Sequence, residues 1–359
     1  MIILDSHCDT PSQVVRLRDL SKRTRLGHVD FLKLKEGGVD ASFFALFTSQ
    51  TMPQDKAAAY VDKMINATVA QVDAYPGAAM AGSIKDILQN KEKGVVSILF
   101  GLENGMPIGS SLGALDGLYK KGVRYVTLTH NGDNQIADSA SQGTTWGGLS
   151  PYGREVVARM NSLGMIVDIA HASDKTFYDC LKASRTPIVS THSCCRALAS
   201  HRRNMSDDML RALAEKGGVI QINFYPTFLS DSFAAAFGAN PLCDQADAVE
   251  LAFIEDPSSA ERKAAWDAMR EKLLLVDRPS YTLIADHIDH AVNKAGMESV
   301  GIGTDFDGIN ISPKGMEDVS KLGLVFAELH RRGYSDDAIE KIAGANFLRV
   351  FADVESASA

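Results

Sequence analysis

Short apolar runs rich in β-branched residues recur along the chain and alternate with amphipathic segments. Most of these runs are almost continuously apolar, which is typical of strands that are buried on both faces of a parallel sheet. The sequence predicts strands over eight runs, which are Ile2–Leu4, Ala41–Phe47, Val95–Phe100, Tyr125–Thr129, Met165–Ala170, Pro187–Thr191, Val219–Phe224 and Ser299–Thr304.

Helical patterns lie between the apolar runs. They cover Asp55–Val72, Leu112–Lys121, Tyr152–Leu163, Ser173–Ala183, Ser206–Lys216, Tyr281–Ala295 and Val319–Arg331. Ser206 is a typical helix N-cap, and Gly217–Gly218 is a typical helix stop. Eight strands that alternate with helices predict an α/β fold of the (β/α)8 TIM barrel type. A doubly wound open sheet is the alternative, but no glycine-rich dinucleotide fingerprint follows the first strand.

The 359 residues suit one barrel with insertions, so we predict a single domain over residues 1–359. Two connections are longer than a short loop, namely Thr10–Val39 and Pro226–Ser280. The second contains a charged, Ala-rich helical segment around Ala246–Leu274. We therefore expect a loop and helical insertion around residues 226–280. It follows a strand, on the side where barrels of this type build their active sites.

The composition is that of an ordinary globular protein, with 45% hydrophobic and 23% charged residues. The net charge of -8 leaves no excess of Lys and Arg for phosphate groups, so we expect no nucleic-acid partner. No apolar stretch approaches the length of a membrane span, and the first residues, MIILDSHCD, do not resemble a signal peptide. We therefore expect a cytoplasmic protein with no membrane partner.

Residues that ligate metals or transfer protons stand where the predicted strands end. The set comprises four of the nine histidines and three acidic residues, which are His7, Asp9, Glu103, His130, His171, His192 and Asp305. All strand ends of a parallel barrel meet at one face, so residues that are far apart in the sequence converge there. This clustering predicts a site at the carboxyl end of the barrel.

The residue types in this set suit zinc, which prefers imidazole nitrogens and carboxylate oxygens. His7 and Asp9 are two positions apart and would point to the same side of a strand, so both can bind one ion. Glu103 can bridge two ions. Two metals roughly 3.5–4 Å apart can share one hydroxide and polarise a carbonyl. The pattern therefore favours a hydrolase with a dinuclear zinc centre.

The other histidines lie on predicted loops or helices, where solvated or helix-capping roles are more common. They are His28, His201, His287, His290 and His330. The five cysteines fit neither a disulfide framework nor a zinc finger, so we expect free thiols. We expect Cys194 and Cys195 to pack in the core, and Cys8 to point away from His7 into the barrel wall.

At these residues the sequence resembles the membrane (renal-type) dipeptidase family, peptidase family M19. The resemblance covers nearly the whole chain, and its segments are specific only as a set. They are DSHCDTP at 5–11, GLENG at 101–105, LTHNGDN at 128–134, GLSPYGREVVARMNSLGMIVDIAHAS at 148–173, STHS at 190–193, ASHRRN at 199–204, NFYP at 223–226 and GTDFDG at 303–308.

The resemblance implies a role for each residue of the set. In the metal centre, His7 and Asp9 would bind the first Zn²⁺, Glu103 would bridge, and His171 and His192 would bind the second. In the substrate site, His130 would contact the scissile carbonyl oxygen, Arg203 the C-terminal carboxylate beside Tyr225, and Asp305 the amino group and the transferred proton. His130, Asp305 and Glu103 would thus be the catalytic residues. Arg202 is the neighbouring alternative to Arg203. The family further implies a homodimer.

Three functions remain open at this point. The first is a zinc-dependent dipeptidase that hydrolyses dipeptides with a metal-bridging hydroxide and no covalent intermediate. The second is a related barrel amidohydrolase that acts on a cyclic amide or a β-lactam, for which the same hydroxide would serve. The third is a catalytically silent barrel, which the complete set of ligand-type residues disfavours.

Overall fold

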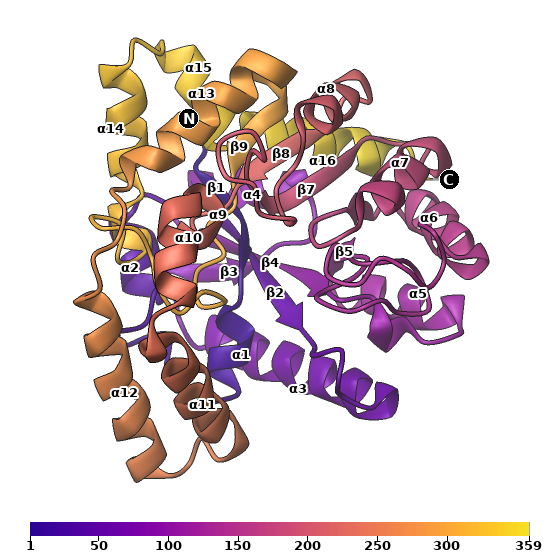
Figure 1. Ribbon diagram of the computed structural model, residues 1–359. Coiled ribbons are helices and arrows are strands. Elements are labelled where there is room, and N and C mark those ends of the chain that lie inside the picture. The colour runs from indigo at the N-terminus through magenta and orange to yellow at the C-terminus, as the bar shows by residue number, and fades with distance from the viewer. Residues whose placement is uncertain (359) are drawn as a thin grey trace.

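The computed structural model describes residues 1–358, and eight parallel strands form its centre. These strands are hydrogen-bonded neighbours in the order β1-β2-β4-β5-β6-β7-β8-β9. Their bounds are β1 (Leu4–Cys8), β2 (Ala41–Phe47), β4 (Val96–Glu103), β5 (Val123–Thr127), β6 (Ile166–Asp168), β7 (Ile188–Ser193), β8 (Val219–Ile222) and β9 (Val300–Ile302). Figure 1 shows the strands in the middle of the molecule with helices around them.

The first strand and the last strand lie side by side and bring the sheet round to a nearly closed barrel. Cys8 forms a parallel bridge with Phe306. The backbone N–H of Asp9 donates to the carbonyl oxygen of Phe306 at 2.8 Å, and that of Asp305 donates to the carbonyl oxygen of His7 at 3.0 Å. The predicted barrel is therefore confirmed, and the open doubly wound sheet is excluded.

Helices cover the outside of the barrel. They are α1 (Thr10–Val14), α2 (Phe31–Glu36), α3 (Gln54–Asp73), α4 (Ile84–Glu92), α5 (Leu112–Lys120), α6 (Pro151–Leu163), α7 (Asp174–Ala183), α8 (Asp207–Glu215), α9 (Pro226–Leu229), α10 (Asp231–Gly238), α11 (Pro241–Glu255), α12 (Ala260–Leu274), α13 (Thr282–Ala295), α14 (Gly323–Arg331), α15 (Asp336–Glu340) and α16 (Asn346–Ser356). Ser206 caps α8 by accepting a hydrogen bond from the backbone N–H of Met209, as predicted. Within residues 1–358, no helix combines the length and the apolar composition needed to cross a bilayer.

The first strand begins later than its apolar pattern indicates. The prediction was Ile2–Leu4, but the strand runs over Leu4–Cys8 and includes polar residues that are fully buried. Apart from Nε2 of His7, their side-chain polar groups have partners inside the barrel. Asp5 accepts hydrogen bonds from the backbone N–H of Thr304 at 2.9 Å and from its hydroxyl at 2.7 Å. Burial is tolerated because these groups are satisfied, and a pattern of apolar residues cannot indicate that.

Two further elements lie outside the predicted pattern. Strand β3 (Ala78–Met80) pairs with β4 beside the main path of the sheet, and helix α4 follows it. The strand has only three residues, so it gives no periodic signal.

The predicted helix Val319–Arg331 is divided into two elements. A 3-10 turn over Val319–Lys321 precedes α14.

The C-terminal helix α16 closes the amino end of the barrel. Phe347 and Phe351 pack with Leu4, Phe43 and other side chains near the starts of the strands. The rings of Phe43 and Phe347 meet edge to face with their centroids 5.4 Å apart. The amino end is thus filled with apolar side chains, and the polar strand ends lie at the opposite end.

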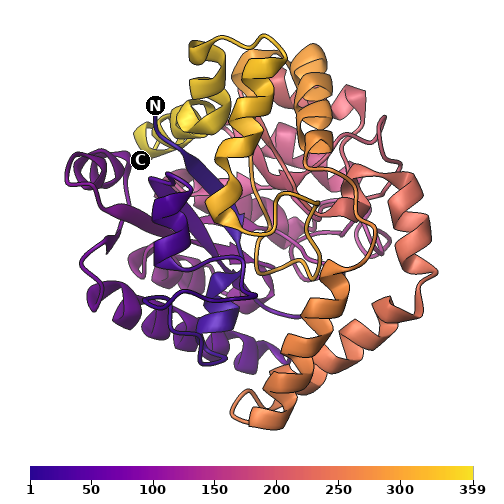
Figure 2. The same cartoon turned by 90° about the vertical axis from the view of Figure 1, so that its left-hand side faces the viewer.

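The segment after β8 is helical and contains α9 to α12. In Figure 1 α11 and α12 lie side by side at the lower left, and Figure 2 shows the same pair at the lower edge of the molecule. These helices have a small apolar cluster of their own, made of Phe233, Phe237, Ala246, Phe253, Trp266, Met269, Leu273 and Ile311. Ile311 is the only member of this cluster from outside the segment, so it connects the segment to the loop after β9.

We expect Phe351→Ala to lower the free energy of unfolding by about 3–5 kcal/mol, because it leaves a cavity in the apolar layer under the barrel. Urea-induced unfolding of the metal-free protein measures this. Leu275→Ala is the control, since Leu275 is 85% exposed and its loss should change stability by no more than about 0.5 kcal/mol. Equal effects of the two substitutions would contradict the role given to α16.

Candidate active site

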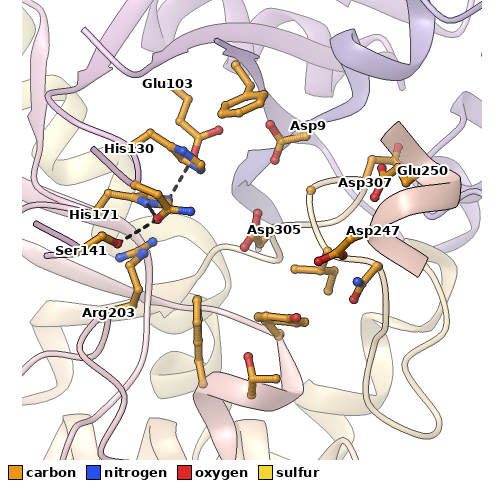
Figure 3. Close-up of a pocket in the computed structure, with 18 of the residues that line it drawn as sticks. Asp9, Glu103, His130, Ser141, His171, Arg203, Asp247, Glu250, Asp305 and Asp307 are labelled. Carbon is orange, nitrogen blue, oxygen red and sulfur yellow. Dashed lines mark hydrogen bonds and ion pairs between the residues drawn. The ribbon is translucent and has the colours of Figure 1, made fainter. Parts of the chain in front are cut away.

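The predicted metal ligands come from the ends of four strands, β1, β4, β6 and β7, and meet in one buried cluster beside His130, which follows β5. His7 and His192 lie within β1 and β7, and Glu103 is the last residue of β4. His130 and His171 lie in the loops that follow β5 and β6. Figure 3 shows His130 and His171 beside Glu103, with Asp9 and Asp305 facing the same space. The predicted convergence is therefore found.

Glu103 occupies the centre of this cluster, and its two carboxylate oxygens face different imidazoles. The Oε1 atom lies 3.1 Å from Nε2 of His171 and 3.7 Å from Nε2 of His192. The Oε2 atom lies 3.6 Å from Nε2 of His7, which is itself 3.5 Å from Oδ2 of Asp9. The prediction placed Asp9 in the strand with His7, but Asp9 is the N-cap residue of α1. Its carboxylate still lies beside the imidazole of His7.

The other ring nitrogen of each of these imidazoles has a partner away from Glu103. Nδ1 of His7 lies 2.8 Å from the hydroxyl of Tyr125, Nδ1 of His171 lies 3.1 Å from Oδ1 of Asn131, and Nδ1 of His192 lies 2.9 Å from Oγ1 of Thr191. When Nδ1 carries the proton, the lone pair is on Nε2, which faces Glu103. This arrangement is typical of histidines that bind a metal.

The cluster contains buried polar atoms that have no partner among the described residues. They are Nε2 of His7, Nε2 of His192 and Oδ1 of Asp9. Orphaned buried polar atoms are rare in native proteins and call for an explanation. Here each one belongs to a ligand-type side chain, and three groups of such side chains hold their ligand atoms within 4.8 Å of one another. The residues therefore fit a divalent metal centre.

Four residues in the strand-end loops around the site adopt the left-handed backbone conformation that residues other than glycine rarely take. The φ angles are 76° for Asn104, 65° for His171, 59° for Asp305 and 66° for Asp307. Each such residue costs of order 1–3 kcal/mol and persists only where the surroundings fix it, commonly at functional sites. The backbone strain thus coincides with residues that line the site or support it.

Burial shapes the protonation of the metal-free site. Burial and the neighbouring Glu103 raise the pKa of Asp9 to about 7, and burial together with Asp9 raises the pKa of Asp305 to about 7. Burial lowers the pKa of His7, but the carboxylates of Glu103 and Asp9 outweigh it and hold that pKa well above its usual value. In the metal-free protein, bound protons therefore reduce the repulsion between these buried carboxylates, as a bound divalent ion would do.

A cavity of about 640 Å³ opens from the cluster and contains the predicted substrate-binding residues, which are His130, Arg203, Tyr225 and Asp305. Arg203 is only 6% exposed and its Nε has no partner within residues 1–358, whereas Arg202 lines the cavity from an exposed position. An Nη2–H of Arg203 donates to the carbonyl oxygen of His192 at 3.3 Å. Of the two arginines, Arg203 therefore has the buried guanidinium that lacks an anionic partner.

Several supporting residues were not assigned from the sequence. Besides the three Nδ1 partners, Asn223 donates from Nδ2 to Oδ2 of Asp305 at 2.8 Å, and Oε1 of Gln50 lies 3.2 Å from Nδ1 of His130. Asn131 and Asn223 belong to the quoted segments LTHNGDN and NFYP, so their positions carried a signal. Nothing in the sequence indicated a role for Tyr125 in the site, because it lies within an apolar run.

Two of the remaining histidines are buried, which corrects the expectation that they are solvated or helix-capping. His28 accepts a hydrogen bond at Nδ1 from the backbone N–H of Asp307, and His287 accepts one at Nδ1 from that of Cys195. A third, His201, lines the cavity. All five cysteines are free, and Cys8 lies 3.4 Å from the hydroxyl of Ser42, away from the cluster.

Sequence comparison identifies the family. Residues 1–359 match the family described as membrane dipeptidase (peptidase family M19). The chain belongs to the membrane dipeptidase family. Membership makes the protein a hydrolase of peptide bonds, and the cluster around Glu103 is where this family member can hold a metal.

Individual relatives agree with the family assignment. The chain is 32% identical to the dipeptidase verJ of Clonostachys rogersoniana, over 94% of this chain and 78% of that protein. It is 33% identical to the uncharacterized dipeptidase C965.12 of Schizosaccharomyces pombe, over 98% of this chain and 80% of that protein. The crystal structure of the probable dipeptidase PvdM from Pseudomonas aeruginosa superposes with a TM-score of 0.84 at 29% identity, over 100% of this chain and 96% of that one.

We expect the affinity for a divalent metal ion to fall as the pH falls below about 7. The pKa of Asp9 in the metal-free protein is about 7, so at lower pH an ion must displace a proton from it. Each released proton weakens apparent binding by about tenfold per pH unit. Calorimetric titration in buffers of different ionisation enthalpy counts these protons. The same count at pH 6 and at pH 8 would contradict the raised pKa.

Proposed function

We propose that the protein is a zinc-dependent dipeptidase with two zinc ions per subunit. The observation that carries the proposal is the central position of Glu103, whose two oxygens face His7 on one side and His171 and His192 on the other. In this proposal His7 and Asp9 would hold the first ion, Glu103 would contribute to both sites, and His171 and His192 would hold the second. A dipeptide as the substrate and the homodimer belong to the same proposal and rest on the sequence resemblance. Zinc as the metal rests on the resemblance and on the imidazole and carboxylate ligand types. The cytoplasmic location, also proposed, rests on the lack of a membrane-spanning apolar run in the sequence.

The substrate carboxylate binds Arg203. A buried guanidinium without an anion is unfavourable, so the free Nε of Arg203 supports a site for an anionic group. Burial lowers the pKa of Arg203 to about 10, and the side chain still carries its charge at neutral pH. Arginine can grip a carboxylate through two parallel hydrogen bonds. Tyr225, which lines the same cavity, completes this end of the site.

The substrate amino group binds Asp305. Asn223 holds one oxygen of this carboxylate at 2.8 Å, which leaves the other oxygen to receive a proton or an ammonium group. The pKa of Asp305 is about 7 because of its burial, and a group with this pKa can accept and pass on a proton near neutral pH. Asp305 is therefore assigned to protonate the leaving amine. Arg203 would bind the carboxylate of the substrate and Asp305 its amino group. The distance between these two charged side chains therefore limits the length of the substrate, and longer peptides are excluded.

His130 is assigned to the scissile carbonyl oxygen. Burial and the charge of Arg203 lower the pKa of His130 to about 3, so the ring is neutral at neutral pH, and it would donate to the substrate oxygen in the tautomer that carries its proton on Nε2. A single well-placed donor to a developing oxyanion stabilises the transition state by about 2.7–4 kcal/mol. Bound zinc ions would supply a hydroxide nucleophile at neutral pH and would polarise the scissile carbonyl.

A hydrolysis screen tests the function. The panel contains neutral dipeptides, a tripeptide, an N-acetylated dipeptide, a dipeptide amide and a carbapenem, each with the protein as isolated and after chelation. We expect cleavage of free dipeptides only, loss of cleavage on chelation and recovery with zinc. Dipeptide cleavage by protein shown to be metal-free would refute the metal-dependent mechanism. Faster cleavage of the carbapenem than of any dipeptide would favour the amidohydrolase alternative.

We expect Arg203→Ala to reduce kcat/KM for a dipeptide by at least about tenfold, because hydrogen bonds to a charged group contribute about 1.5–3 kcal/mol. Steady-state kinetics on one dipeptide and on its C-terminal amide measure this. The amide lacks the carboxylate, so the substitution should change its slow turnover much less. Arg202→Ala is the matched control. If Arg202→Ala has the large effect and Arg203→Ala has none, the assignment is wrong.

A further inference from the structure

Tyr125 occupies an unusual place for a hydroxyl group. It lies in β5, its side chain is fully buried in the barrel, and its ring packs against Phe43 with the centroids 5.3 Å apart. A phenylalanine would fill the same space without the cost of burying a polar group. The hydroxyl has one hydrogen-bond partner in the described residues, which is Nδ1 of His7 at 2.8 Å.

Gly101 provides the space for the Tyr125 ring. It lies in β4 directly opposite Tyr125 in the strand register. A Cβ atom at this position would lie 2.0 Å from Cζ of Tyr125 and 2.2 Å from Cε2, far inside van der Waals contact. Glycine inside a strand weakens the strand and often marks a close approach of another group. The first glycine of the GLENG segment thus has a steric role, which is to leave room for the tyrosine.

The contact with Tyr125 determines what His7 can bind. Nε2 of His7 faces Asp9 and Glu103 and has no partner. It presents a lone pair only if the proton is on Nδ1, and the Tyr125 oxygen is the atom placed to accept the hydrogen bond that Nδ1–H then donates. His171 and His192 have their own partners in Asn131 and Thr191, so Tyr125 supports only one of the three imidazoles.

We propose that Tyr125 is a positioning residue for the metal site formed by His7 and Asp9, and that Gly101 is present to admit its ring. This inference rests on the proposed dinuclear centre. The hydroxyl acts through His7, since it holds the imidazole in one orientation and in the tautomer that leaves Nε2 free. Partners of this kind typically change metal affinity by about 10- to 100-fold when removed.

The test is Tyr125→Phe, which keeps the ring and removes the oxygen. Zinc is titrated into the metal-depleted protein in competition with a chromophoric chelator, so that a Kd is obtained for each of two ions. We expect one Kd to rise by about 10- to 100-fold and the other to stay within about twofold. Tyr178→Phe, which removes a hydroxyl from the partly exposed helix α7, should change neither.

Each outcome decides a separate question. If both Kd values of Tyr125→Phe match the wild type, or if both rise equally, Tyr125 is a packing residue and the inference is wrong. If the wild type binds no zinc, the proposed function fails instead. Gly101→Ala is a second route to the same site, because it displaces the ring. In a folded Gly101→Ala protein, adding Tyr125→Phe should weaken zinc little further, whereas additive effects would contradict the coupling of the two positions.

Discussion

The cost of burying two carboxylates beside each other is the constraint on which the site depends. Glu103 and Asp9 are both almost entirely removed from solvent, and each lies near the imidazole of His7. A buried carboxylate must be protonated, paired or bound to a metal. In the metal-free chain protons shared with His7 serve this purpose, as the raised pKa values of Asp9 and His7 indicate. Bound divalent ions would offset the same negative charge in place of these protons.

The barrel supports this arrangement with a second layer of polar groups below the ligands. Asp168 accepts hydrogen bonds from the backbone N–H of Thr191 at 2.9 Å and from its hydroxyl at 2.7 Å. The same hydroxyl oxygen lies 2.9 Å from Nδ1 of His192, so the carboxylate orients the imidazole through the threonine. Asp5 holds Thr304 in a similar way near the loop that carries Asp305. The Asp168 contacts join the neighbouring strands β6 and β7, whereas the Asp5 contacts join β1 to the segment after β9 and therefore depend on the closure of the barrel.

The sequence predicted the barrel and the convergence of its ligand residues because both depend on local patterns. Apolar runs identify strands, and the residue types at their ends identify the chemistry. What the patterns could not indicate depends on contacts between distant residues. In the sequence, Tyr125 is an ordinary member of an apolar strand. Only the structure shows that its hydroxyl lies beside His7. The late start of β1 and the burial of His28 and His287 have the same origin, since partners from other elements satisfy their polar groups.

The measurement that tests this account most directly is a crystal structure of the zinc-loaded protein with anomalous data collected on both sides of the zinc absorption edge. The account predicts two anomalous peaks that flank the carboxylate of Glu103, one beside Nε2 of His7 and one beside Nε2 of His171 and His192. A single peak, or peaks that leave Glu103 without a metal contact, would contradict it.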